Sequence, residues 1–262
     1  MSSTAAALSA EPALLRDVVV VGGGCYGTFY ATQLERARAR GAAAYRRLIL
    51  VDRDPGCRAA RDLPPDPARE LVVRDWGVFF DEFLAAPADS GAGAEARDAI
   101  VPSPLMPHLM YEWLLRRARA RWPGREIASA SLQAPIGTPY DVLAPDGTRY
   151  VSFADWLCPT HCIEPAICPV IKGPRTWEMG DALADYVARL DRAAPTRGPV
   201  LFVTRHRAYG VGMFDVDSVR AGDRQVAEAG ASGDPVDVLV GTISACHGAV
   251  SLLRLGPHAG PR

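Results

Sequence analysis

Short runs of consecutive apolar residues punctuate the first half of the chain. The clearest is Val18–Val21, four valines in a row, and Arg47–Asp52 and Asp98–Ser103 contain similar runs. Unbroken apolar runs of this length are typical of strands buried on both faces of a parallel sheet. Between and after them the apolar spacing predicts helices over 28–40, 77–86 and 105–121, with a further strand over 70–76. The alternation of strand and helix is the pattern of βαβ units.

The pattern changes after residue 125 and then returns. A strand over 126–133 and a hairpin over 141–151, with Pro145-Asp146-Gly147 at its turn, precede an irregular stretch, 157–177, that holds three cysteines and four prolines. The α/β rhythm then resumes, with predicted helices over 178–193 and 219–229, strands over 199–204 and 237–243, and a loop over 209–214. We expect 237–243 to be the last strand.

These elements predict an α/β fold of the Rossmann-like kind, a mostly parallel sheet flanked by helices, with a hairpin and Cys-rich insertion. The expected parts are a flexible tail (1–16), a dinucleotide-binding α/β half (17–125), the insertion (126–178), a C-terminal α/β portion completing the same sheet (179–255), and a second tail (256–262).

The first valine run leads directly into a glycine-rich turn and then into a helix. Gly22, Gly24 and Gly27 have the spacing G-x-G-x-x-G. In that pattern the first glycine allows a tight turn, the second lets backbone approach a pyrophosphate, and the third lets the helix pack closely on the strand. Free N–H groups at the helix start then face the phosphates.

Residues 17–52 resemble the Rossmann-type NAD(P)/FAD-binding superfamily through these three glycines and Asp52 at the end of the second strand. The resemblance implies a bound dinucleotide whose ribose hydroxyls donate to Asp52. The adjacent Arg53 leaves both NAD and NADP open, and FAD is the less favoured alternative. The cofactor-binding residues that we expect are Gly22, Gly23, Gly24, Cys25, Tyr26, Gly27, Asp52, Arg53 and Ser103.

Composition changes this interpretation little. The formal net charge of −1 gives no basis for nucleic-acid binding, and no apolar run reaches the roughly 20 residues of a membrane span. The first residues lack the basic and apolar regions of a signal peptide, so we expect a cytoplasmic protein with a small-molecule substrate. Assembly with further copies of the chain stays open. In that compartment the six cysteines favour free thiols, metal ligands or catalytic groups over disulfides.

Reactive side chains follow several predicted strands, and in open α/β sheets ligands bind where strands end. His206 follows the strand over 199–204, while Cys246 and His247 follow the strand over 237–243. Because histidine titrates near neutral pH, His206 and His247 are candidate proton-transfer groups, and Cys246 is a candidate catalytic thiol.

The segment Cys158–Lys172 carries a second kind of chemistry. Cys158, Cys162 and Cys168 are spaced C-x3-C-x5-C-P, with His161 between the first two. Closely spaced thiolates bind soft metals or iron–sulfur clusters, so these four residues are the candidate metal ligands, with His247, Cys246 and Cys57 as further candidates. Thiol redox chemistry and a structural role remain alternatives.

The leading hypothesis is therefore an NAD(P)-dependent oxidoreductase-like protein with a cysteine-ligated zinc or iron–sulfur site near the cofactor. The alternative is a non-catalytic nucleotide-binding sensor in which cysteine oxidation or metal loss alters a partner surface.

Overall fold

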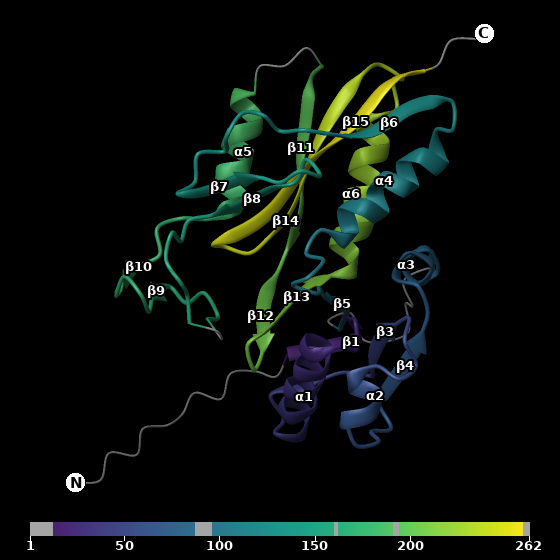
Figure 1. Ribbon diagram of the computed structural model, residues 1–262, viewed down its shortest axis with the longest axis vertical. Coiled ribbons are helices and arrows are strands. Elements are labelled where there is room, and N and C mark those ends of the chain that lie inside the picture. Colours follow the sequence, from purple (N-terminus) through teal and green to yellow (C-terminus); the bar gives the residue numbers. More distant parts are fainter. Residues whose placement is uncertain (1–12, 87–95, 160–161, 191–193, 259–262) are drawn as a thin grey trace.

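Two separate sheets organise the protein in this computed structural model (Figure 1). The structure describes residues 13–86, 96–159, 162–190 and 194–258. Within them, an N-terminal sheet has the strand order β12-β13-β5-β1-β3-β4, and a C-terminal sheet has the order β11-β14-β15-β8-β7. Two short additions complete them, because β2 pairs with β1 and β6 pairs with β15.

The N-terminal sheet has a parallel part and an antiparallel edge. Its strands are β1 (Ala13–Val21), β2 (Ala43–Ala44), β3 (Arg47–Asp52), β4 (Arg69–Val73), β5 (Arg97–Val101), β12 (Arg205–Ala208) and β13 (Val211–Asp215). The strands β4, β3, β1 and β5 are parallel, whereas β13 joins β5 in antiparallel orientation. Ala13–Arg16, expected to belong to a tail, lie in β1.

The valines of β1 explain its central position. Val18 and Val20 pack on one side with Leu34 of helix α1 (Cys25–Ala39). Val19 and Val21 pack on the other side, with Phe80 of helix α3 (Trp76–Ala85). None of the four valines is more than 3% exposed, so each face of the strand is covered. Burial on both faces is the property that the unbroken apolar run predicted.

The C-terminal sheet is mostly antiparallel. Its strands are β6 (Arg125–Ala130), β7 (Tyr140–Leu143), β8 (Arg149–Ser152), β11 (Thr196–Val203), β14 (Val236–Ile243) and β15 (His247–His258). The parallel pairing of β11 with β14 is the exception. The long strand β15 pairs with β14 on one side and with β6 and β8 on the other.

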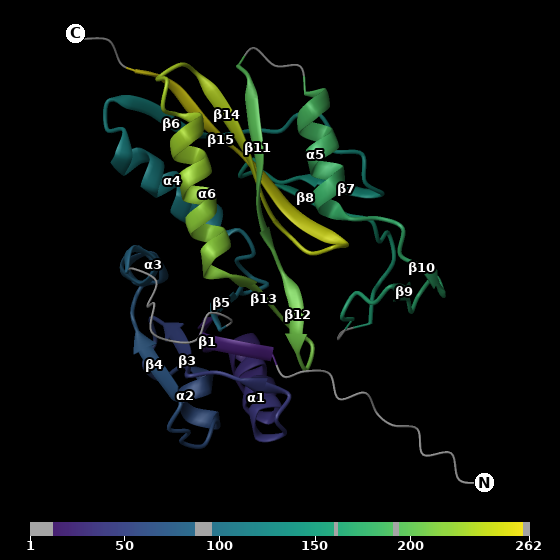
Figure 2. The same ribbon diagram turned by 180° about the vertical axis from the view of Figure 1, so that it is seen from behind.

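The helices lie in layers between and outside the sheets. They are α1 (Cys25–Ala39), α2 (Arg58–Asp62), α3 (Trp76–Ala85), α4 (Leu109–Arg121), α5 (Met179–Arg189) and α6 (Val216–Ala229). Residues of α3, α4 and α6 share one apolar core with both sheets, whereas α5 packs on the opposite face of the C-terminal sheet. Figures 1 and 2 show α5 and the α4–α6 pair on opposite sides of β11. In the described residues, no helix is both long and apolar enough to cross a membrane.

The chain passes from one sheet to the other at Thr204. This residue separates β11, in the C-terminal sheet, from β12, in the N-terminal sheet. Its N–H donates to the carbonyl of Ile243 at 2.7 Å. A side chain at Gly212 would come within 2.7 Å of Thr204 Cγ2, so β13 approaches this crossing closely. Thr204 therefore lies where the two sheets meet.

The prediction of one mostly parallel, Rossmann-like sheet is wrong. Only β12 and β13 of the C-terminal portion extend the N-terminal sheet, whereas β11, β14 and β15 build a second sheet in which antiparallel pairs dominate. The predicted hairpin is not an insertion but the edge of that sheet, since β8 pairs with β15. The loop expected over 209–214 is largely strand β13, and β15 follows the strand that was expected to be the last.

The Cys-rich stretch has little regular structure, as its prolines indicated. Its described part contains β9 (Ile167–Cys168) and β10 (Gly173–Pro174), two residues each and paired with each other. The tail predicted over 256–262 is wrong for residues 256–258, which belong to β15. Residues 259–262 lie outside the described residues.

Candidate functional site

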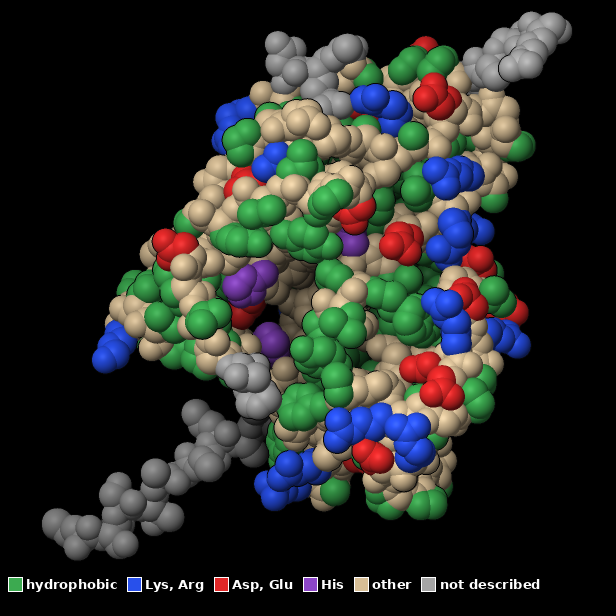
Figure 3. Space-filling view, in the orientation of Figure 1, with side chains coloured by type: hydrophobic (Ala, Val, Ile, Leu, Met, Phe, Trp, Pro, Cys, Tyr) green, Lys and Arg blue, Asp and Glu red, His purple; other side chains and the backbone are tan. Residues whose placement is uncertain are grey.

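A pocket of about 900 Å³ lies where the two sheets meet. Figure 3 shows a hollow on this face of the molecule, with histidine side chains in purple beside it. The wall is built by five segments: the start of α1, the loop after β5, the edge hairpin, Thr204 with its neighbours, and the β14–β15 turn. Cys162 of the Cys-rich segment also lines it. The volume is within the range of small-molecule sites.

The wall is aromatic and uncharged. Five aromatic residues, Tyr26, Phe29, Tyr30, Tyr140 and Tyr150, line the pocket. No Asp, Glu, Lys or Arg is found among the described residues that form the wall. Polar groups come instead from serine, threonine, cysteine and the two histidines. Such a lining suits a neutral, flat group better than a charged one.

The glycine-rich turn lies beside the start of α1 and has the local geometry that its spacing predicted. Gly22 has a φ of +86°, a conformation that favours glycine. A Cβ at Gly27 would lie 1.8 Å from the carbonyl oxygen of Gly22, so the helix and the turn are in close contact there. By contrast, a Cβ at Gly24 would meet nothing within 4 Å. The backbone at Gly24 is therefore open to a ligand.

Asp52 lies on the β3 side of this turn, away from the pocket wall. Its Oδ2 accepts a hydrogen bond of 2.6 Å from the N–H of Gly23, and its Oδ1 accepts one of 2.9 Å from the N–H of Asp54. A carboxylate accepts up to about four hydrogen bonds, so capacity for ribose hydroxyls remains. Arg53 is engaged elsewhere, 3.4 Å from Asp75 and over the ring of Trp76.

Other predicted cofactor-binding residues lie on the β5 side. Cys25 and Tyr26, in the first turn of α1, and Ser103, after β5, all line the pocket. The sheet places β1 between β3 and β5. Asp52 and the pocket consequently lie on opposite sides of the strand that carries the glycines.

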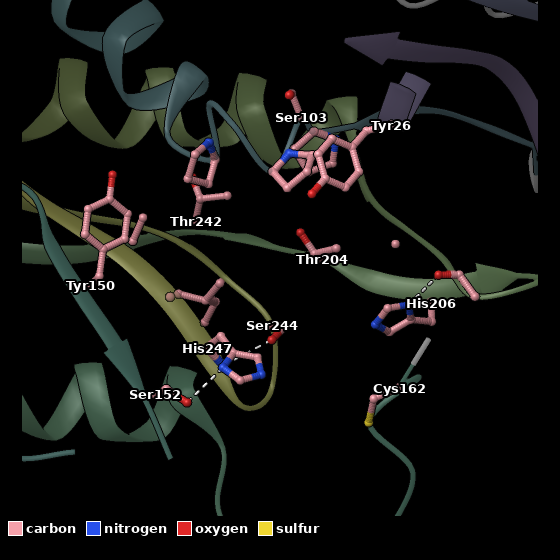
Figure 4. Close-up of a pocket in the computed structure, with 18 of the residues that line it drawn as sticks. Tyr26, Ser103, Tyr150, Ser152, Cys162, Thr204, His206, Thr242, Ser244 and His247 are labelled. Carbon is pink, nitrogen blue, oxygen red and sulfur yellow. Dashed lines mark hydrogen bonds between the residues drawn. The ribbon is translucent and has the colours of Figure 1, made fainter. Parts of the chain in front are cut away.

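His206 has one ring nitrogen fixed by the backbone. Its Nδ1 lies 2.9 Å from the carbonyl oxygen of Gly210. A carbonyl can only accept, so Nδ1 carries the proton and Nε2 of the neutral ring is left with a lone pair. Figure 4 shows the second ring nitrogen of His206 on the other side of the ring from this hydrogen bond, directed toward the interior of the pocket.

His247 is oriented by Ser152 on the neighbouring strand. Ser152 Oγ donates to the carbonyl of Ala154 at 2.9 Å and accepts from the N–H of Ala154 at 2.8 Å. Its remaining lone pair therefore faces His247 Nδ1, 2.8 Å away, which assigns the proton to that nitrogen. Burial lowers the pKa of His247, while the Glu164 carboxylate acts in the opposite direction.

Cys246 is not part of this pocket. Its thiol accepts a hydrogen bond of 3.3 Å from Trp177 Nε1 and, with Cys158, Cys162 and Cys168, lines a second, smaller cavity. Burial raises the pKa of Cys246 to about 11. A buried thiol with a raised pKa is a poor nucleophile, so the structure gives no support to the predicted catalytic role.

The predicted metal ligands are only partly described. Among the residues that the structure describes, no group of three or more His, Cys, Asp or Glu side chains is arranged to hold a metal ion. His161 lies outside the described residues. The three predicted cysteines nevertheless line the same small cavity, which shares Cys162 and His247 with the large pocket.

Several residues of the pocket escaped sequence reasoning. Ser152 of β8 pairs with Tyr140 of β7 on one side and with His247 of β15 on the other, so the three residues lie side by side across the sheet. Alternation within β8 also puts Tyr150 on the same face as Ser152. The hairpin motif could have identified Tyr150 and Ser152 as neighbours on one face. It could not have indicated their partner, because β15 was not predicted.

Comparisons with known proteins place the C-terminal sheet in a family. The sequence model of a family described as "Uncharacterized protein, C-terminal domain" matches residues 110–256, more than half of the chain. This span contains the strands of the C-terminal sheet except the last two residues of β15, together with His206, His247 and the Cys-rich segment, but not the glycine-rich turn. No curated protein and no solved structure matches the chain.

Proposed function

The chain belongs to the family described as the C-terminal domain of an uncharacterized protein, and from the geometry of the pocket we propose that it binds NAD or NADP and exchanges hydride with a neutral substrate. The observation that carries the proposal is the position of the glycine-rich turn. Its helix, α1, presents Cys25 and Tyr26 to an uncharged pocket of about 900 Å³. FAD is the alternative dinucleotide.

The two sides of β1 suit the two halves of a dinucleotide. Adenosine would lie on the β3 side, where Asp52 keeps acceptor capacity for ribose hydroxyls, and the pyrophosphate would approach Gly24 and the start of α1. The reactive ring would enter the pocket on the β5 side, next to Ser103 and the tyrosines. This division also agrees with charge, because the phosphates stay outside the uncharged pocket.

His206 is the residue best placed to move a proton. When bound, the dinucleotide supplies the two-electron acceptor for a hydride. Oxidation of a hydroxyl to a carbonyl then releases one proton, which Nε2 of His206 can accept, since Nδ1 is held by Gly210. In the reverse direction the protonated ring donates to the carbonyl oxygen. His247, oriented by Ser152, is a second group that can bind the substrate oxygen.

The pocket wall also limits the substrate. Without a charged side chain among the described lining residues, the pocket offers no partner for a carboxylate or phosphate. Tyrosine rings offer flat apolar faces together with hydroxyl groups. We therefore expect a neutral hydroxy or carbonyl compound with an apolar or aromatic body.

Isothermal calorimetry on matched variants tests the proposal. Gly24→Ala adds a methyl group at the phosphate approach but meets nothing within 4 Å, and Gly124→Ala adds the same group at a site that is equally open and lies in the turn between α4 and β6. The wild type should bind NAD, NADP or FAD. Gly24→Ala should weaken binding roughly tenfold or more with its melting temperature unchanged, and Gly124→Ala should bind normally.

Turnover separates the two hypotheses about activity. Hydride transfer that fails in His206→Gln while dinucleotide binding persists would support the oxidoreductase. Binding that responds to the state of the cysteines, with no hydride transfer to any acceptor, would favour the non-catalytic sensor, because Cys162 and His247 border both cavities. Absence of binding to all three dinucleotides would overturn the proposal.

A further inference from the structure

The loop between β5 and α4 is fastened to the C-terminal sheet by a buried side-chain contact. His108, the last residue of this loop, is 7% exposed, and its Nδ1 lies 3.2 Å from Oγ1 of Thr242 in β14. Thr242 lines the pocket, as does Ser103 near the start of the same loop. Figure 4 shows Thr242 and Ser103 on one side of the pocket and His206 and His247 on the other. Thr242 therefore faces the part of the pocket that suits the reactive ring of the dinucleotide.

The ring of His108 is packed flat against Tyr111 and is uncharged. The two ring centroids are 4.7 Å apart, with an angle of 9° between the ring planes. Burial lowers the pKa of His108 to about 3, so at neutral pH the imidazole carries a single proton. Its Nε2 is buried and has no hydrogen-bond partner among the described residues. The location of the one proton therefore decides what Nδ1 offers to Thr242.

That location follows from the cost of burying an unpaired donor. With the proton on Nε2 of His108, a buried N–H would lack an acceptor, whereas with the proton on Nδ1 only a lone pair is unused. Buried N–H groups without an acceptor are rarer in proteins than under-used acceptors. Nδ1 consequently donates to Thr242 Oγ1. Within the described part of the chain the Thr242 hydroxyl has no second partner, so its own proton is free to donate to a ligand.

The surroundings of this hydroxyl suit a flat ring with a neutral acceptor. Thr242 lies opposite Ala249 of β15, which in turn lies opposite Tyr150 of β8. Residues that are directly opposite in antiparallel strands share one face of a sheet. The row thus offers a hydroxyl group at each end and only a methyl group between them. A planar ring has room over Ala249, and a carbonyl at its edge can reach Thr242.

We propose that Thr242 donates a hydrogen bond to the carboxamide oxygen of a bound nicotinamide, and that His108 is the positioning residue that directs the hydroxyl. The inference rests on the proposed function, because it assigns one contact within the same pocket. His108 is not among the residues that line the pocket, so it acts through Thr242. Proton transfer stays with His206, and Thr242 recognises the cofactor. A site of this kind discriminates against an analogue with a poorer acceptor, because its buried donor is then left unpaired.

Isothermal calorimetry with two probes tests the contact. The probes are the nicotinamide dinucleotide that the wild type binds and its thionicotinamide analogue, in which sulfur replaces the carboxamide oxygen. Because sulfur is a weak acceptor, the wild type should bind the analogue about five- to tenfold more weakly. Thr242→Val keeps the shape of the side chain without the hydroxyl and should bind both probes with similar affinity. Thr148→Val, which removes a buried hydroxyl bonded to Ser251 outside the pocket, should keep the wild-type preference.

Variants of His108 separate positioning from a structural role. His108→Asn keeps an N–H donor near the place of Nδ1 and should retain the preference for the oxygen-containing cofactor. His108→Phe keeps a ring against Tyr111 without the donor and should bring the two affinities together. Loss of the preference in both variants would show that His108 is merely structural, and a preference that persists in His108→Phe would contradict positioning.

The remaining outcomes distinguish this inference from the proposed function. Equal binding of the two probes by the wild type, or an unchanged preference in Thr242→Val, would overturn the contact and leave the proposed function intact. The Thr242→Val result decides the contact even where His108→Phe fails to fold. A wild type that binds no nicotinamide dinucleotide at all would overturn the proposed cofactor and the contact together.

Discussion

The two sheets differ in how far their pairing follows the order of the chain. In the parallel part of the N-terminal sheet β1 and β3 are separated by one helix and a short strand, and both are apolar runs visible in the sequence, although β13 joins this sheet from more than 100 residues beyond β5. In the C-terminal sheet β15 pairs with β6 and β8, more than 90 residues earlier in the chain. The comparison teaches that the local pattern identifies strands, whereas the arrangement of partners depends on contacts across the whole chain. The pocket forms where the two sheets meet.

The two sheets are nevertheless joined by a shared core. Phe202 of β11 and Phe214 of β13 belong to different sheets, and their ring centroids are 5.9 Å apart. Neither side chain is more than 2% exposed. The two sheets therefore differ in topology but share one core, and we expect them to unfold together.

The largest effect is expected from Phe202→Ala, which removes one half of this contact. Loss of a fully buried phenylalanine should lower the free energy of unfolding by about 3–5 kcal/mol. Urea unfolding followed by tryptophan fluorescence and by circular dichroism should show a single transition with both probes, at a lower urea concentration than in the wild type. Phe202→Leu, which keeps most of the volume, should lose about 1–1.5 kcal/mol. Separate transitions for the two probes would show that the sheets unfold independently.

A smaller effect is expected from pH, through His108 at the start of α4. Burial lowers the pKa of His108 from its usual 6.5 to about 3, and its Nε2 is buried without a partner among the described residues. Between about pH 3 and pH 6.5, His108 therefore binds a proton in the unfolded chain but not in the folded protein. The free energy of unfolding therefore keeps its full contribution from neutral His108 above pH 6.5 and loses it as the pH drops toward 3. At pH 5 the loss is about 2 kcal/mol.

Urea unfolding of the wild type and of His108→Gln at pH 7.5 and pH 5 measures this contribution. The carboxylates of the protein affect both proteins alike, so the difference between the two pH dependences isolates the histidine. An identical loss of stability in wild type and variant would show that His108 is protonated in the folded protein.

The smallest effect is local and concerns the tie between the Cys-rich segment and the C-terminal sheet. Glu164→Ala removes both hydrogen bonds to the β14–β15 turn, at a cost of about 1–2 kcal/mol. Hydrogen exchange should become faster at Ala245 and through the segment, with little change in β1 or β3. Glu82→Ala, which removes an exposed carboxylate on α3, is the matched control. Unchanged exchange at Ala245 would show that other contacts hold the segment.

The sequence by itself determined the first buried strand and the local geometry of the glycine-rich turn. Val18–Val21 indicated a strand buried on both faces, and the spacing of Gly22, Gly24 and Gly27 indicated a turn with one open and one crowded glycine. These properties depend on neighbouring residues alone, which is why they can be read locally. His206 and His247, which the sequence placed after two predicted strands, both line this pocket.

Only the tertiary structure decided which groups act together. Cys246 and His247 are adjacent in sequence, yet the Cys246 side chain lines the small cysteine cavity, while His247 also borders the large pocket opposite Ser152. That separation depends on the turn geometry and on the register of β15 against β8. Register is fixed by backbone hydrogen bonds between strands far apart in the chain, and a single residue of slip would reverse which side chains face the pocket.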